Sequence, residues 1–110
     1  MKKLILIAAL TCATAHAEFL TGNDLLARLN STDSYERGTA MGYILGTFDA
    51  THGITHCPPQ NVTAGQIKDM VAKTLTDAPS VRHLAADSFV TYTLKNTWPC
   101  ADKKKGGTAL

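Results

Sequence analysis

The sequence predicts an all-α protein, a compact bundle of about four helices joined by one disulfide bond between Cys57 and Cys100. Apolar residues recur at the i, i+3, i+4 spacing of amphipathic helices in four segments. β-Branched residues do not alternate with polar ones over any long run, and the one strand candidate, residues 89–93, has neighbours with a helical pattern. The two cysteines belong to a domain whose N-terminal segment indicates export.

This N-terminal segment has the features of a secretory signal peptide. Two lysines begin it, an almost unbroken apolar run occupies residues 4–13, and an Ala-His-Ala sequence at residues 15–17 provides a cleavage site. The apolar run is shorter than the roughly 20 residues that cross a bilayer as a helix, and no later segment is longer. We therefore expect cleavage before Glu18 and a mature domain, residues 18–100, in the periplasm without a membrane anchor.

Cleavage also changes the charge of the protein. The full chain has 11 Lys and Arg and 9 Asp and Glu, but two of the lysines belong to the leader and three form a run in the tail, residues 101–110. The tail is polar, basic and glycine-containing, which is typical of a disordered segment. The remaining body is mildly acidic, and this charge does not favour binding to nucleic acid.

The cysteines of the mature chain predict one disulfide bond. Cys12 leaves with the leader unless it is the lipidation site of a lipoprotein, and residues 9–11 lack the small residue usually found immediately before such a cysteine. Cys57 and Cys100 remain, and two cysteines in an exported chain most simply pair, which stabilises such a loop by roughly 4 kcal/mol. The alternative is a pair of free thiols for metal binding or catalysis.

The first two helices are expected over residues 23–30 and 34–52. Thr21 or Asn23 can cap the first, a polar turn at residues 30–33 ends it, and Gly53 suits the left-handed position after the second. Their buried faces are defined by apolar residues at helical spacing: Leu25, Leu26 and Leu29 in the first, and Met41, Ile44, Leu45 and Phe48 in the second.

Three glycines recur every four residues along the second helix. Gly38, Gly42 and Gly46 each cost about 1 kcal/mol of helix stability relative to alanine. Close approach of another helix would offset this cost. That helix belongs either to the same chain, which is the simpler expectation, or to a dimer or partner surface.

The third and fourth helices are expected from Thr63 onwards and over residues 84–97. Two prolines at residues 58 and 59 predict an extended loop before the third helix, and Thr63 with Gln66 forms a capping box at its start. Residues 77–80 stop it. Their apolar stripes comprise Ile67, Met70, Val71, Thr74 and Leu75 in the third helix and Leu84, Phe89, Val90, Leu94 and Trp98 in the fourth.

The residues offer no catalytic constellation, metal site or cofactor site. His52, His56 and His83 are scattered, and we expect each at the surface or at a helix end. His52, His56 and Cys57 suggest a metal cluster, but a structural zinc site needs four ligands and Cys57 is expected in the disulfide. Asp49, inside the second helix, is expected to make a structural hydrogen bond. The residues thus predict a non-enzymatic binding or structural protein.

A set of short motifs resembles the Rap/Tai family of immunity proteins from type VI secretion systems. The resemblance covers residues 19–100. It includes the opening at residues 19–25, the Gly-Tyr-Ile motif within residues 41–46 followed by Asp49-Ala50 and Gly53, and the terminal Pro99-Cys100. Family members often carry a second cysteine pair, and the equivalent positions here are Leu29 and Ala40. The joint absence of that pair strengthens the assignment of Cys57 to Cys100.

The resemblance implies a periplasmic protein that binds a peptidoglycan amidase toxin and blocks its active-site groove, typically as a homodimer. By this analogy the partner-binding surfaces are the third helix and the loop after it. They comprise Lys68, Lys73, Asp77, Ala78, Pro79, Ser80, Val81, Arg82 and His83. The alternative is a small periplasmic stress chaperone of the acid-activated helical disulfide type.

Overall fold

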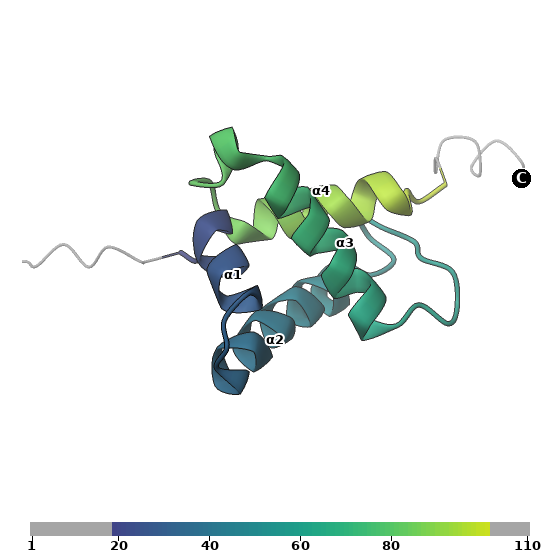
Figure 1. Cartoon of the computed structure of the whole chain (residues 1–110). Coiled ribbons are helices and arrows are strands. Elements are labelled where there is room, and N and C mark those ends of the chain that lie inside the picture. The colour runs from purple at the N-terminus through teal and green to yellow at the C-terminus, as the bar shows by residue number, and fades with distance from the viewer. Residues whose placement is uncertain (1–18, 102–110) are drawn as a thin grey trace, which may run out of the picture.

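The computed structural model describes residues 19–101, and in this part of the chain it confirms the predicted all-α fold (Figure 1). Four helices follow one another, with a short 3₁₀ helix, η1, before the last: α1 (Gly22–Leu29), α2 (Ser34–Thr51), α3 (Ala64–Asp77), η1 (Pro79–Val81) and α4 (Ala86–Thr97). Within these residues no helix is long and apolar enough to cross a membrane. The predicted signal peptide and nearly all of the predicted tail lie outside the described residues.

Side-chain caps fix where the helices begin. At α1, the Thr21 hydroxyl accepts a hydrogen bond from Asp24 N at 3.2 Å, and the Asp24 carboxylate accepts one from Thr21 N at 3.0 Å, a complete capping box. The Asp24 carboxylate accepts a second hydrogen bond from the Thr21 hydroxyl at 2.8 Å. The bond from the Thr21 backbone N–H and then that from its hydroxyl hold the pKa of Asp24 below its ordinary value. At α3 only half of the predicted box forms, because Gln66 donates its backbone N–H to Thr63 but its side chain does not return the bond.

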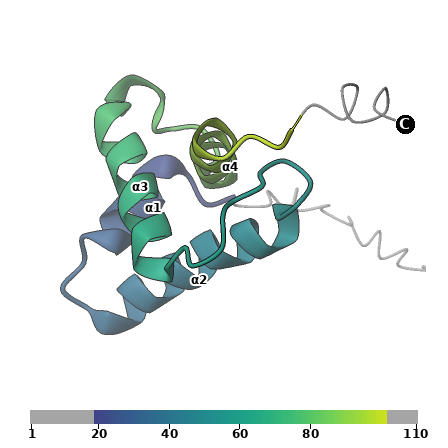
Figure 2. The ribbon, with the colours of Figure 1, turned by 90° about the vertical axis from the view of Figure 1, so that its right-hand side faces the viewer.

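The core draws on all four helices. Its buried apolar side chains are Leu25, Ala40, Ile44, Ile67, Val71, Leu75, Ala86, Phe89, Val90 and Leu94. Figure 2 shows α4 nearly end-on, with α2 crossing along one side of the molecule. Because α2 lies on that side, its fully buried stripe is narrow.

The predicted core of α2 is confirmed in part, and the prediction for Leu84 is wrong. In α2 Ile44 is fully buried, as is Ala40 one turn before it, whereas Met41, Leu45 and Phe48 are half-buried; Leu45 and Phe48 still pack against the core. Leu84 is 49% exposed because α4 begins two residues after it, at Ala86.

The predicted disulfide between Cys57 and Cys100 is present, and it joins the loop after α2 to the end of α4. The backbone N–H of Cys57 also donates to the Trp98 carbonyl at 2.8 Å. The long loop between α2 and α3 is therefore held against α4 at one place by both a covalent and a hydrogen bond.

The glycines of α2 do not pack against any other part of residues 19–101. Gly38, Gly42 and Gly46 are exposed, and a Cβ added at any of them would meet no atom within 4 Å among the described residues. The expectation of intramolecular helix packing at these positions is therefore wrong, and a dimer or partner surface remains a prediction. Gly53, in contrast, has the predicted left-handed conformation, with φ of 75°.

A candidate partner-binding surface

The connector between α3 and α4, residues 78–85, is short and hydrogen-bonded within itself. Ala78 ends α3 by donating to the Leu75 carbonyl, and Pro79 then starts η1, where a missing N–H is tolerated. Val81 donates to the Ala78 carbonyl at 3.3 Å and Leu84 to the Val81 carbonyl at 3.0 Å. The predicted loop is therefore an ordered turn of helix.

Backbone hydrogen bonds also fix this connector to the start of α1. Gly22 donates to the Leu84 carbonyl at 2.9 Å, Asn23 to the Arg82 carbonyl at 2.8 Å, and Ala86 to the Leu20 carbonyl at 2.7 Å. Two of these donors are N–H groups of the first turn of α1, which have no partner inside the helix. The connector thus has little freedom left to lose when a partner binds it.

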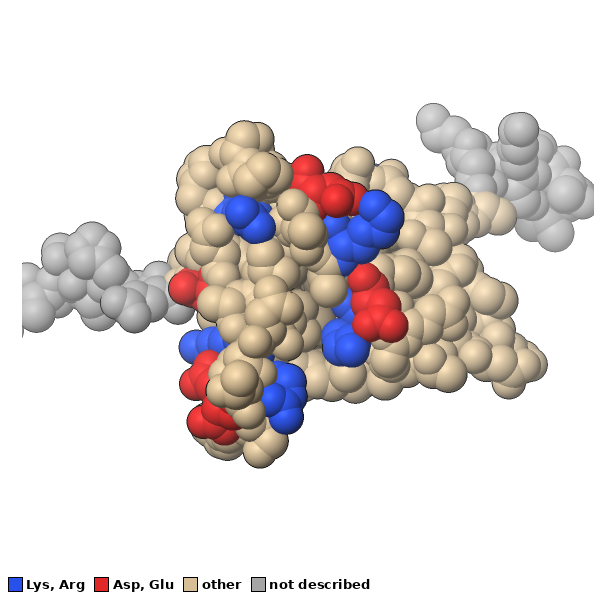
Figure 3. Space-filling model, in the orientation of Figure 1, with Lys and Arg blue, Asp and Glu red and all other residues tan. Residues whose placement is uncertain are grey.

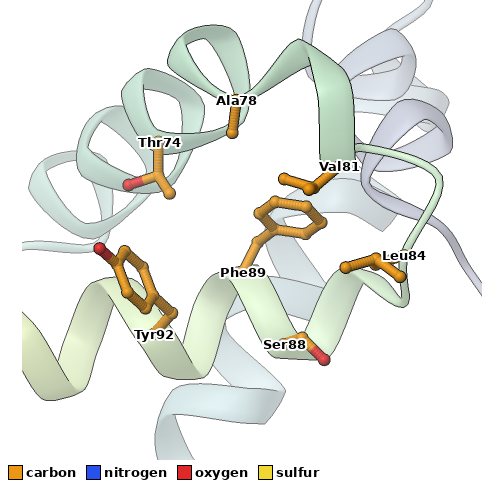
Figure 4. Close-up of a pocket in the computed structure, with 7 residues that line it drawn as sticks. All are labelled: Thr74, Ala78, Val81, Leu84, Ser88, Phe89 and Tyr92. Carbon is orange, nitrogen blue, oxygen red and sulfur yellow. The ribbon is translucent and has the colours of Figure 1, made fainter.

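An apolar groove opens between α3, the connector and α4 (Figure 4). It has a cavity volume of about 330 Å³ and is lined by Thr74, Ala78, Val81, Leu84, Ser88, Phe89 and Tyr92. In Figure 4 the rings of Phe89 and Tyr92 rise from α4 toward α3 and η1. Val81, Leu84 and Tyr92 are 41%, 49% and 64% exposed, whereas Phe89 is buried. A concave apolar site of this kind suits a protruding apolar side chain.

The floor of the groove rests on a pair of threonines that joins α3 to α4. The hydroxyl oxygens of Thr74 and Thr93 lie 2.8 Å apart, and Thr93 donates to the Phe89 carbonyl at 2.7 Å. Thr93 is buried, so these bonds satisfy its hydroxyl and keep the two helices in register.

The charges beside the groove are arranged in pairs on α3. Lys68 lies 3.0 Å from Asp69, and Lys73 forms an ion pair with Asp77 one turn later. Figure 3 shows basic and acidic side chains next to each other on this face of the molecule. Both predicted binding lysines are therefore already paired in the free protein, and their net electrostatic effect on a partner is small.

The structure brings most of the predicted binding residues to one surface. Exposed positions are Asp77, Pro79, Ser80, Val81 and His83. Ala78 and Arg82 are half-buried. Arg82 Nε is buried without a hydrogen-bond partner among the described residues, and the Arg82 carbonyl holds the connector by accepting from Asn23 N.

Five of the residues that line the groove are absent from the predicted binding set. Thr74, Leu84 and Phe89 were expected in the core, and Ser88 and Tyr92 were not singled out. Leu84, Ser88 and Tyr92 recur every four residues, a spacing that places them on one side of α4 and the residues before it, but core residues share this spacing.

Two expectations about polar residues are wrong. His56 is fully buried rather than at the surface, with its ring centroid 4.7 Å from that of Phe48. Asp49 is exposed, and no hydrogen bond to its side chain forms among residues 19–101. In the same residues no three His, Cys, Asp or Glu side chains come together as a metal site.

Comparison with known proteins adds one finding to this geometry. A family model described as Rap1a immunity proteins matches residues 21–100, a stretch that begins at the cap of α1 and ends at the second bridge cysteine. No curated protein matches the chain.

Proposed function

The chain belongs to the Rap1a immunity protein family, and from this premise we propose that it is a periplasmic immunity protein which binds and inhibits a peptidoglycan amidase effector of a type VI secretion system. An immunity protein acts by forming a complex with its effector. This role requires a surface and no catalytic groups, in keeping with a family that is not typically catalytic.

The observation that supports the binding surface is the apolar groove beside the fixed connector. Val81, Leu84 and Tyr92 offer partly exposed apolar area, and large apolar and aromatic side chains in a pocket contribute most of the affinity at protein interfaces. The connector is already ordered by its bonds to α1, so binding requires little further ordering. We propose that η1 enters the active-site groove of the amidase while the groove of this protein holds an apolar side chain of the effector.

A matched pair of variants tests this surface. Val81→Asp places a charge at the groove. Ile54→Asp makes a comparable change at an exposed aliphatic residue in the loop after α2, which lies beside the C-terminal end of α4, away from the groove. We expect Val81→Asp to raise the Kd for the cognate amidase at least tenfold, about 1.4 kcal/mol, because a charge would be buried against apolar groups. Ile54→Asp is expected to bind as the wild type does.

The measurements are titration calorimetry with the purified amidase and survival of cells that export it. Thermal unfolding of both variants establishes that each is folded. Equal binding by Val81→Asp and the wild type would refute the groove as the binding surface. Cells that lyse equally fast with and without the wild-type protein would refute immunity to that amidase.

A further inference from the structure

His56 occupies a site that accommodates a neutral imidazole and no cation. Its side chain is fully buried beside the end of α2. Its ring centroid lies 4.7 Å from that of Phe48 and 5.8 Å from that of His52. On its polar side, His56 Nδ1 lies 3.2 Å from the Thr51 hydroxyl, and Nε2 has no hydrogen-bond partner among the described residues.

The neighbouring hydroxyl determines which ring nitrogen carries the proton. Thr51 donates its hydroxyl hydrogen to the Thr47 carbonyl at 2.8 Å, so the same oxygen accepts from His56 Nδ1. Nε2 then carries a lone pair and has no hydrogen-bond partner among the described residues. Protonation would place a second N–H there, charged and without an acceptor, and burying such a group is costly.

The charged groups around this site would not stabilise an imidazolium. At the C-terminal cap of α2, His52 carries no negative charge, and the pKa of His56 is lowered first by burial and then by the charge of His52. From α4, Lys95 faces the adjoining hollow lined by Ile54 and Thr55. Asp49 lies on α2 one turn before His52 and is exposed, and none of the ion pairs among residues 19–101 involves His56.

We propose that the turn at residues 52–57, which we term the histidine turn, is an acid-sensitive latch: protonation expels His56 from its site and opens the turn while the four helices stay folded. The hydrogen bonds that would break are local. Gly53 donates to the His56 carbonyl at 2.8 Å, and Ile54 and Thr55 donate to the Thr51 carbonyl at 3.0 and 3.1 Å.

The fold confines this opening to one end of the molecule. The disulfide from Cys57 to Cys100 keeps the turn attached to the C-terminal end of α4. The apolar groove lies toward the N-terminal end of the same helix, where Leu84 and Ser88 line it (Figure 4). Acid would therefore expose the face of Phe48 without disturbing the connector.

The experiment follows the mature protein by NMR between about pH 7.5 and pH 4.5. The ring signal of His56 gives its pKa, and hydrogen exchange at the amides of Gly53, Ile54 and Thr55 gives the opening constant of the turn after correction for intrinsic exchange. Stability from a histidine with a lowered pKa is present above the ordinary value of 6.5 and is lost as pH falls toward the folded-state pKa. We expect the opening constant to rise as the pH falls across that window, by at most about tenfold per pH unit, which is the limit for the uptake of one proton.

Two variants provide the control. His56→Met fills the site with an adaptable apolar side chain and should abolish the pH dependence of opening, whereas His83→Gln, an exposed residue of the connector, should retain it. A His56 ring that titrates at or above 6.5 in the wild type overturns the proposal, and so does opening that is independent of pH. If His56→Met does not fold, the ring titration and exchange of the wild-type protein decide alone.

Discussion

The lack of a side chain at Gly22 allows three segments to meet. A Cβ at this position would lie 2.7 Å from Phe89 Cε2 and 2.9 Å from the Arg82 carbonyl oxygen. Both neighbours belong to the candidate surface, one as the floor of the groove and one as part of the connector. The small size of this residue thus permits the hydrogen bonds that hold the connector on α1.

We expect Gly22→Ala to destabilise the fold by about 1–3 kcal/mol, because one of the crowded atoms is backbone and the other belongs to a buried ring. Gly65→Ala is the matched control, since a Cβ in the first turn of α3 meets nothing within 4 Å. Urea unfolding of both variants measures the difference. A Gly22→Ala protein as stable as the control would show that the connector can shift without cost.

At the scale of the element, α2 differs most from its sequence-based interpretation. Its one fully buried face is narrow, and its three glycines lie on exposed positions with empty space beyond them. The conformational cost of these glycines is therefore not offset by any contact among residues 19–101. The homodimer that the family resemblance implies stays a prediction, and this face of α2 is one place to test it.

Gly42→Ala is expected to stabilise the isolated domain by about 1 kcal/mol, because alanine has the higher helix propensity and its Cβ meets no neighbour. Thermal unfolding at micromolar and millimolar concentrations, with sedimentation equilibrium to define the oligomeric state, measures this. If Gly42→Ala were less stable than the wild type under conditions where both are monomeric, the glycine face of α2 could not be open to solvent. A weakened dimer alongside a more stable monomer would identify the glycines as its interface.

At the scale of the whole molecule, the two ends of the bundle are held together by different bonds. At one end the connector is hydrogen-bonded to the start of α1, and at the other the disulfide joins the loop after α2 to the end of α4. The helices between them bury ten apolar side chains. A domain of this size buries a modest fraction of its surface when it folds. The disulfide bond is therefore expected to contribute a large part of its stability.

Replacing both bridge cysteines by serine is expected to lower the free energy of unfolding by as much as about 4 kcal/mol, because the bridge spans 43 residues of sequence. Denaturant unfolding of the double variant and of the chemically reduced wild type should agree. If both lose less than about 1 kcal/mol, the bridge contributes little and export would not be needed for stability.

The sequence allowed the helices to be predicted because their signals are local. Caps such as Thr63, the proline that begins η1 and the left-handed glycine at residue 53 each act within one turn, and the observed bounds differ from the predicted ones by no more than two residues. The disulfide was predictable because only two cysteines follow the predicted signal peptide. Spacing alone did not reveal the groove, because Leu84 and Phe89 have the same pattern as core residues.

The sequence by itself thus determined the helical class, the order of the helices and the covalent bridge. Tertiary structure alone decided which apolar side chains remain open, that the glycine face of α2 has no neighbour within the described residues, and that His56 is buried. These outcomes depend on contacts between residues far apart in the chain. Hydrophobic periodicity shows that a face is apolar, but burial requires a second surface, and the position of that surface is set by the packing of the whole bundle.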